Sequence, residues 1–494
     1  MISRSARKCL GAWGAVLGVA LILRLIGLST RGIWYDDAFS YFLARRNLGE
    51  IITGTAADTM PPLYYLLLHL WMQLGRDITT LRLLSVLLSL SVVAATFWLT
   101  RALFGLRAAT AAGVLTAVSP FHVYHAQELR MYSVLCLSLL LHVGFFSAVY
   151  LDQPRSPRVC WLGLIISGAA AMYSHNLAIF TLVSANLLLL LQGRWHLLGQ
   201  LLLAQTGMLV LAAPWIVLVP GQVAKVQRAF WTPRPGLLEV MQALVTIHTD
   251  LPVPKWMLPV ALMTSVLTAT IITYELVRDQ EHPPRIHLLL SFAGFPPLLT
   301  LMTSYIMRPV FVPRGFILSS VAYYALAAVV LTKRTPRWIG ALSLVTFVCV
   351  ATMALPSTYA FGAFPRSPFR AAGVFLTRRL VEGDIILHDN KLSFLPMLYY
   401  EPDLPQTFLP DQPGSHNDTL APATQKAMHI YPSTSLEEAT DGASRVWVVF
   451  FARSVREWED QGRSHPTLEA LERTFARTDH VTFNDLGILL FEQR

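Results

Sequence analysis

The stretch Trp34–Ser40 (WYDDAFS) places two adjacent carboxylates, Asp36 and Asp37, between two apolar runs. The first run covers about residues 9–28, and the second follows Pro61–Leu63. The first is long enough to cross a bilayer, which takes about 20 apolar residues. Because only 14% of the 494 residues are charged, a pair of carboxylates beside a membrane span is the first place to look for chemistry.

The rest of the chain is strongly apolar, with 54% hydrophobic residues and a mean hydropathy of +0.49. Several runs reach the length of a membrane span, which predicts a polytopic α-helical membrane protein. The net charge of +9 does not indicate a nucleic-acid partner, because the basic residues are scattered through loops, where they set topology or meet lipid phosphates. The four cysteines form neither a disulfide framework nor a zinc pattern.

The apolar runs predict about eleven transmembrane helices. Basic residues before the first run favour a cytoplasmic N-terminus and a retained first span, which puts the C-terminus outside, although charge alone also allows the inverted topology. The predicted spans are 9–28, 82–99, 108–120, 133–150, 161–174, 177–191, 197–218, 257–276, 286–305, 315–332 and 338–355.

The run from Leu63 to Gly75 is too short to span the membrane and predicts a re-entrant or interfacial helix that begins at the prolines. Because that helix does not cross, Arg82 is expected on the same face as Asp36, together with segment 122–132. Two domains follow: a transmembrane domain of residues 1–356, whose first outer loop is 29–81, and a small extracytoplasmic α/β domain of residues 357–494. In the second domain the pattern predicts strands at 384–387, 446–451 and 487–491 and helices near 369–381 and 467–476.

Asp36 and Asp37 have two interpretations. Asp36 can cap a helix that begins near Ala38 while Asp37 is solvated, since Asp is a common N-cap. Alternatively, one carboxylate is a general base and the other orients it or holds a metal. Two adjacent carboxylates repel each other, which raises one pKa and suits a base that removes a proton from an acceptor hydroxyl.

Other ionisable residues lie next to apolar sequence. Asp58 precedes the short helix and can either cap it or join the site. Arg82 and Arg314 can extend to the interface or bind a lipid phosphate. The polar patch formed by segment 122–132, between two spans, has three interpretations. It is an ordinary loop, a phosphate site or a metal site, and the spacing of its histidines is only a weak metal signal. Its candidate substrate-binding residues are His122, His125, Glu128, Arg130 and Tyr132.

The order of four motifs resembles a known family. WYDDAFS at 34–40, DTMPPLYY at 58–65, LRLLS at 81–85 and SPFHVYHAQELRMYS at 119–133 are similar to the bacterial protein-mannosyltransferase-like proteins. These are C-type integral-membrane glycosyltransferases of glycosyltransferase family 39, related to the aminoarabinose transferase that acts on lipid A. The resemblance is close over residues 10–150, looser to about residue 355, and absent from the tail.

The resemblance implies a polyprenyl-phosphate-linked sugar donor, an active site at the outer face of a bacterial plasma (inner) membrane, and inverting single displacement. It maps the catalytic carboxylate onto Asp36. The second position, usually Glu, is Asp37 here, whose side chain is shorter by one methylene. Asp58, Arg82 and the pair Glu128 and Arg130 match family positions in the same cavity. A divalent cation is possible, with Asp37 and Glu128 as candidate ligands.

We therefore predict a hexosyl- or pentosyltransferase that moves the sugar to a hydroxyl or phosphate of a glycan, lipid or protein acceptor. Asp36 is its general base, and Arg82, Arg130 and Arg314 stabilise the carrier phosphate. A transporter or flippase for a lipid-linked sugar is the alternative; it requires polar residues near mid-span or paired broken helices. A third class is a non-catalytic assembly or sensor protein whose tail binds a partner.

Overall fold

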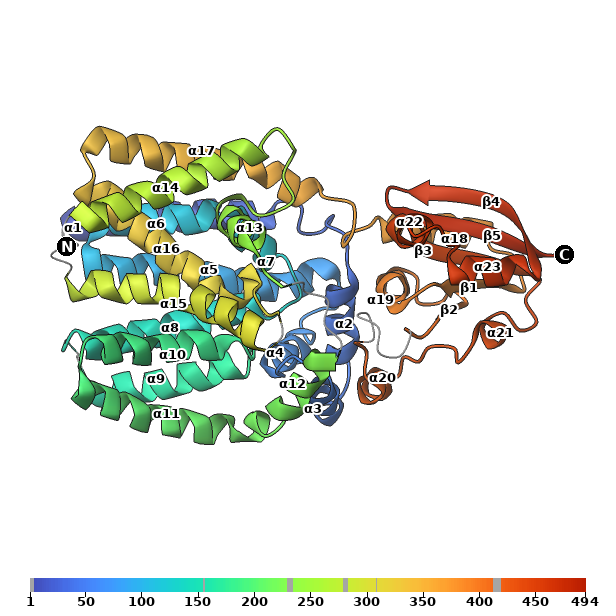
Figure 1. The fold of residues 1–494 in the computed structure, drawn as a ribbon, viewed down its shortest axis with the longest axis horizontal. Coiled ribbons are helices and arrows are strands. Elements are labelled where there is room, and N and C mark those ends of the chain that lie inside the picture. The colour runs from blue at the N-terminus through green and yellow to red at the C-terminus, as the bar shows by residue number, and fades with distance from the viewer. Residues whose placement is uncertain (1–3, 154–155, 229–233, 279–282, 308, 412–418) are drawn as a thin grey trace. The chain divides into compact units, whose positions relative to one another are not determined.

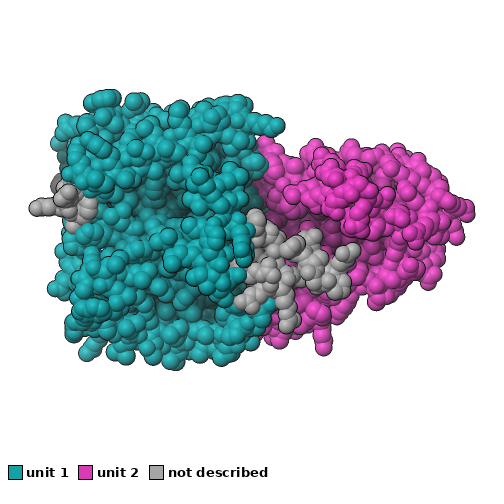
Figure 2. Space-filling view, in the orientation of Figure 1, with its two compact units in different colours: residues 1–28, 58–359 teal, residues 29–57, 360–494 magenta. Residues whose placement is uncertain are grey.

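The protein divides into two compact units in a computed structural model that describes residues 4–153, 156–228, 234–278, 283–307, 309–411 and 419–494. The first unit contains residues 1–28 and 58–359, and the second contains residues 29–57 and 360–494 (Figure 2). The segment 29–57, which we assigned to the first outer loop of the transmembrane domain, thus forms one compact unit with the C-terminal residues.

The first unit consists of helices (Figure 1). They are α1 (Arg4–Leu25), α4 (Leu63–Trp71), α5 (Ile78–Phe104), α6 (Leu106–Val118), α7 (Pro120–Ala126), α8 (Tyr132–Tyr150), α9 (Pro157–Met172), α10 (Ala178–Leu191), α11 (Trp195–Ile216), α12 (Val219–Arg228), α13 (Leu237–Thr249), α14 (Leu258–Arg278), α15 (Pro284–Ile306), the 3₁₀ turn η1 (Pro313–Phe316), α16 (Ile317–Val329), the π-turn η2 (Val330–Arg334) and α17 (Arg337–Ala360). Helix α5 is central, because it contacts α1, α4, α6, α7, α8 and α16.

Eight helical segments in the described part of the chain are long and apolar enough to cross a membrane: α1, α5, α8, α11, α14, α15, η1 to η2, and α17. Three of the eleven predicted spans coincide instead with the shorter apolar helices α6, α9 and α10. The predicted outer loop 219–256 contains helices α12 and α13. The prediction of a polytopic α-helical membrane protein is confirmed.

Helix α4 has nine residues, about 14 Å at 1.5 Å per residue, and so cannot cross a bilayer. Its first N–H, at Leu63, donates to the carbonyl oxygen of Tyr173 at 3.0 Å. Helix α5 then begins with Asp77 as its N-cap, which accepts a hydrogen bond from the backbone N–H of Thr80. The short helix expected after the prolines is therefore present, and the next span begins just before Arg82.

The second unit contains a five-stranded sheet in the order β2-β1-β3-β5-β4. β1 pairs in parallel with β2 and β3, whereas β5 pairs antiparallel with β3 and β4. The elements are α2 (Tyr35–Ala44), α3 (Leu48–Ala57), α18 (Phe369–Arg379), β1 (Asp384–His388), α19 (Lys391–Tyr400), β2 (Gln406–Phe408), α20 (Pro422–Met428), α21 (Leu436–Ala439), β3 (Arg445–Phe451), α22 (Ala452–Glu459), α23 (Pro466–Glu472), β4 (Phe475–Phe483) and β5 (Leu486–Gln493). The expected C-terminal α/β fold is confirmed.

Helices α2 and α3 join this unit by packing on α19 and α20. Gly54 of α3 lies in a close contact, since a Cβ there would lie 2.8 Å from Leu43 Cδ1 and 3.0 Å from the Cβ of Ala427. The Gly54 carbonyl accepts a hydrogen bond from Thr424 at 3.0 Å, and the Tyr41 and Tyr399 rings meet edge to face at 4.8 Å. The residues of segment 29–57 thus find their packing partners near the end of the chain.

Candidate functional site

The polar patch of the first unit lies where α5 begins and where α7 passes into α8. Helix α7 starts at Pro120, with Ser119 as its N-cap, and the chain turns through residues 127–131 before α8 begins at Tyr132. The Ser85 hydroxyl of α5 donates to the Glu128 carbonyl at 2.7 Å and contacts the Tyr64 hydroxyl of α4 at 2.9 Å. Hydrogen bonds therefore hold together the short helix, the start of α5 and the 127–131 turn.

His125 and Glu128 form a buried pair at the centre of this patch. The Nδ1 atom of His125 lies 2.7 Å from Oε2 of Glu128, and their side chains are 6% and 1% exposed. The Tyr132 ring packs against the His125 ring at 4.6 Å. A carboxylate so deeply buried is stabilised by a hydrogen-bonded partner, and the imidazole fills that role here.

Arg130 and Arg314 approach the same place from different elements. Arg130 donates to the Tyr65 hydroxyl at 3.1 Å, and Arg314 of η1 lies over the Tyr132 ring, 5.8 Å from its centroid. Both act on His175 in the connection between α9 and α10. Burial, and then the positive charges of Arg314 and Arg130, lower the pKa of His175 to about 3. The site therefore keeps this imidazole neutral beside two permanent cations.

Asp58 lies at the edge of this group and faces Lys225 of α12, with 3.7 Å between carboxylate and ammonium. Asp58 precedes α4 but does not cap it, because the N-cap of that helix is Pro62. Asn176 donates to the backbone carbonyl of Thr59 and to the Gln222 side chain, both at 2.9 Å. Polar contacts thus join the connection before α4, the connection before α10 and helix α12.

Two of the predicted residues, Arg82 and His122, make further contacts with other parts of the first unit. Arg82 is fully buried, and it donates to the carbonyl oxygen of Leu28 at 2.9 Å. His122 turns toward α16, where its Nε2 lies 2.8 Å from the Ser320 hydroxyl and its ring is 5.9 Å from that of Tyr324. His125 thus contacts Glu128, whereas His122 contacts Ser320 of α16.

Asp36 and Asp37 lie in the first turn of α2 in the second unit. The helix starts at Tyr35 with Trp34 as its N-cap, so the interpretation of Asp36 as a cap for a helix beginning near Ala38 is wrong. The positive N-terminal end of the helix dipole stabilises negative charge on both carboxylates. They differ in exposure, because Asp37 is completely buried whereas Asp36 is partly exposed.

A metal was proposed from Asp37 and Glu128. Within the described ranges, no three His, Cys, Asp or Glu side chains are placed to hold a metal ion. The closest side-chain atoms of His125 and Glu128 are hydrogen-bonded to each other. We derive no step through a metal.

Sequence reasoning missed four residues that surround these groups: Tyr65, His175, Asn176 and Lys225. His175 and Asn176 are adjacent polar residues between two apolar runs, a signal that could have found them. Lys225 is separated from Asp58 by more than 160 residues and has no motif around it.

The comparisons with known proteins agree with this architecture. The profile of the dolichyl-phosphate-mannose-protein mannosyltransferase family matches residues 59–218, which include α4 to α11. No curated protein sequence matches the chain.

Solved structures match over nearly the whole chain. ArnT from Cupriavidus metallidurans in the apo state has a TM-score of 0.65 at 14% identity, covering 98% of both chains. The same protein bound to undecaprenyl phosphate has a TM-score of 0.64 at 15% identity, covering 96% of this chain and 97% of that chain. The Archaeoglobus fulgidus oligosaccharyltransferase, also at low identity (11%), has a TM-score of 0.52 and covers 98% of this chain and 74% of that one.

The fold is therefore that of the C-type integral-membrane glycosyltransferases. The likeness to ArnT includes the C-terminal unit as well as the helices, since it covers 98% of each chain. The expected C-type fold is confirmed.

Proposed function

We propose that the chain is a glycosyltransferase that uses a polyprenyl-phosphate-linked sugar and works at the outer face of the plasma membrane. The observation that carries the proposal is the group of His125, Glu128, Arg130 and Arg314 at one end of the helices of a C-type fold. The family profile over residues 59–218 and the undecaprenyl phosphate bound by the similar ArnT structure support it.

In this proposal Asp36 is the general base. Its carboxylate takes the proton of the acceptor hydroxyl as the acceptor oxygen bonds to the anomeric carbon of the sugar. The bond from that carbon to the carrier phosphate breaks, and its electron pair leaves with the phosphate, which inverts the anomeric centre. Partial exposure suits Asp36 to this role, whereas Asp37 is completely buried.

Arg130 and Arg314 are the residues that we propose to stabilise the departing phosphate. Arg314 lies over the Tyr132 ring, which packs against the His125 ring. Arg130 and Arg314 both lower the pKa of His175, which supports their acting on one anion. Guanidinium groups bind phosphate oxygens in a fixed planar geometry, and fixed cations lower the barrier most where charge develops. Because His175 stays neutral, it can hydrogen-bond a sugar hydroxyl without adding a third cation.

The test is transfer by the purified full-length protein, supplied with a bacterial envelope extract that contains both polyprenyl-phosphate sugars and acceptors, and scored by mass spectrometry as loss of sugar from the carrier lipid. Asp36→Asn should reduce turnover by about 10²–10⁴-fold, the usual contribution of a general base, while leaving undecaprenyl phosphate binding unchanged. Asp441→Asn, at an exposed turn of the second unit, is the matched control. Near-normal turnover of Asp36→Asn would remove that residue from the base role.

The same preparation separates transfer from transport. In vesicles without acceptor, a flippase would exchange labelled lipid-linked sugar across the bilayer in a counterflow assay, and Asp36→Asn would leave that exchange intact. A transferase would show sugar loss from the carrier only when acceptor is present.

A further inference from the structure

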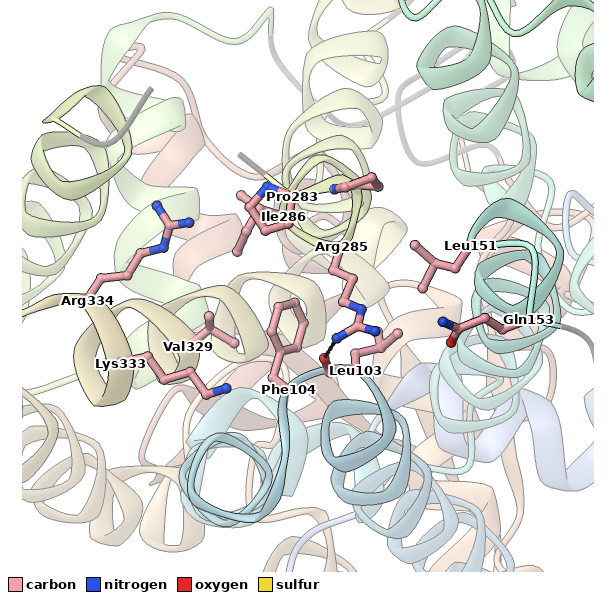
Figure 3. A pocket seen from close by; sticks show the side chains of 11 residues that line it. Leu103, Phe104, Leu151, Gln153, Pro283, Arg285, Ile286, Val329, Lys333 and Arg334 are labelled. Atoms are coloured by element: carbon pink, nitrogen blue, oxygen red, sulfur yellow. Dashed lines mark hydrogen bonds between the residues drawn. The ribbon is translucent and has the colours of Figure 1, made fainter. Parts of the chain in front are cut away.

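An open pocket lies in the first unit, away from the groups described above. It measures about 480 Å³ and is lined by the ends of four helical segments (Figure 3). Its lining residues are Leu103 and Phe104 at the end of α5, Leu151 and Gln153 after α8, Pro283 to Ile286 at the start of α15, and Val329, Lys333 and Arg334 at the end of α16 and in η2.

This cavity is at the other end of the bundle from the candidate site. Arg82 and Leu103 both belong to α5, and 21 residues of helix separate them, which is about 32 Å at 1.5 Å per residue. That distance matches the roughly 30 Å thickness of the hydrocarbon core. The cavity therefore lies at the level of the head groups of the opposite leaflet, and it cannot contribute to the site around Glu128.

The lining combines cations with apolar walls. Arg285, Lys333 and Arg334 supply three positive charges, and none of the described lining residues is acidic. One nitrogen of Arg285 donates to the Leu103 carbonyl at 2.9 Å, which fixes the guanidinium at the cavity (Figure 3). Phe104 stands beside the cations in the same view. An anion with an attached apolar chain matches both features.

The backbone that carries two of these cations is irregular and tightly held. In η2 the Thr335 N–H donates to the Val330 carbonyl at 3.0 Å, five residues back. Such π-turns are rare and are frequently found at functional sites. Helix α17 packs directly onto the turn at Gly340, where a Cβ would overlap the Leu331 carbonyl oxygen. The turn that presents Lys333 and Arg334 is therefore a built element of the fold.

We propose that this cavity binds the phosphate of an anionic membrane lipid, with Arg285, Lys333 and Arg334 around the phosphate and the apolar walls along the start of its chains. The ordinary explanation for basic residues at helix ends is that they set topology, which does not require that three of them line one pocket. The depth of the cavity favours a lipid phosphate over a free one, because lipid phosphates are concentrated at that level.

The experiment is native mass spectrometry of the full-length protein with added phosphatidylglycerol or phosphatidylcholine, with and without millimolar inorganic phosphate. The test variant is Arg285→Gln with Lys333→Gln. The matched control is Arg101→Gln with Arg107→Gln, which removes two exposed charges at the turn between α5 and α6, outside the cavity lining. Thermal unfolding of each variant checks its fold.

The wild type should prefer phosphatidylglycerol, and the test variant should bind it about 30-fold more weakly, since each basic residue near a membrane surface contributes about fivefold. The control variant should bind each of the two lipids with an affinity within twofold of that of the wild type. Gln153→Glu, which adds a negative charge at an exposed lining position, should weaken phosphatidylglycerol binding and leave the unfolding temperature unchanged.

Three results would overturn the proposal. Equal losses in the test and control variants would mean that surface charge alone attracts the lipid. Displacement of phosphatidylglycerol by millimolar phosphate would assign the cavity to a free anion. Equal binding of the two lipids would mean that protein carboxylates neutralise the cations; Asp279 and Glu281 precede Pro283 in the sequence but lie outside the described residues.

Discussion

His388 makes the stability of the second unit depend on pH. Its side chain is fully buried in β1, where Nδ1 lies 3.1 Å from the Ser393 hydroxyl and Nε2 lies 3.2 Å from the Gln406 side-chain oxygen. Burial lowers the pKa of His388 from 6.5 to about 3. The unfolded chain binds this proton at higher pH than the folded chain, so acid favours unfolding.

The size of the effect follows from these two values. The stability that the neutral, buried His388 gives to the folded unit is fully present above pH 6.5. It is lost as the pH falls from 6.5 toward 3. Between pH 7.5 and pH 5 the unfolded imidazole becomes almost fully protonated, which favours the unfolded state by about 30-fold, or about 2 kcal/mol. Most carboxylates stay ionised over this range, so their titration does not obscure the effect of His388.

Hydrogen exchange measured on the full-length protein can test this locally. Peptides covering β1 and β3 should lose about 30-fold in protection between pH 7.5 and pH 5, after correction for the pH dependence of chemical exchange. His388→Gln should lose only a few-fold, and His429→Gln, whose side chain is 56% exposed, should behave as the wild type. Equal losses in wild type and His388→Gln, or unchanged wild-type protection, would refute the reasoning.

Two further substitutions test the first unit. Gly340→Ala should lower the unfolding temperature by several degrees, because its Cβ overlaps a backbone oxygen and overpacking costs about 1–3 kcal/mol; Gly199→Ala, with nothing within 4 Å, should not, and equal melting curves would contradict this packing. Glu128→Gln should reduce turnover in the lipid-extract assay at least tenfold, because it removes the charge from a buried 2.7 Å hydrogen bond with His125 that is worth about 1.5–3 kcal/mol. Unchanged turnover would exclude Glu128 from the site.

Much of the helical part could be predicted because each span is an apolar run of recognisable length. The interfacial helix was also predictable, since its run is too short and begins at prolines. In the second unit, strands β1, β3 and β5 were found because both faces are apolar. Strand β4 was missed because it lies at the sheet edge and is mostly polar and exposed, and β2 because it has only three residues.

The candidate site was predictable where its residues follow one another in the chain. The segment around His125, Glu128 and Arg130 is a continuous motif, and the structure places His125 and Glu128 in contact. The ion pair of Asp58 and Lys225 joins distant segments, so a single sequence contains no local sign of it. The placement of residues 29–57 with the C-terminal unit was missed for the same reason.

That placement has a consequence for biogenesis. Contacts such as the Ile33 N–H with the Tyr400 hydroxyl join residues 367 positions apart, and strand β5 ends only at Gln493. At about 5–20 residues per second, α2 waits tens of seconds after its synthesis for the rest of its unit. Truncation near the C-terminus should therefore disturb the helix that carries Asp36, although hundreds of residues separate them in the chain.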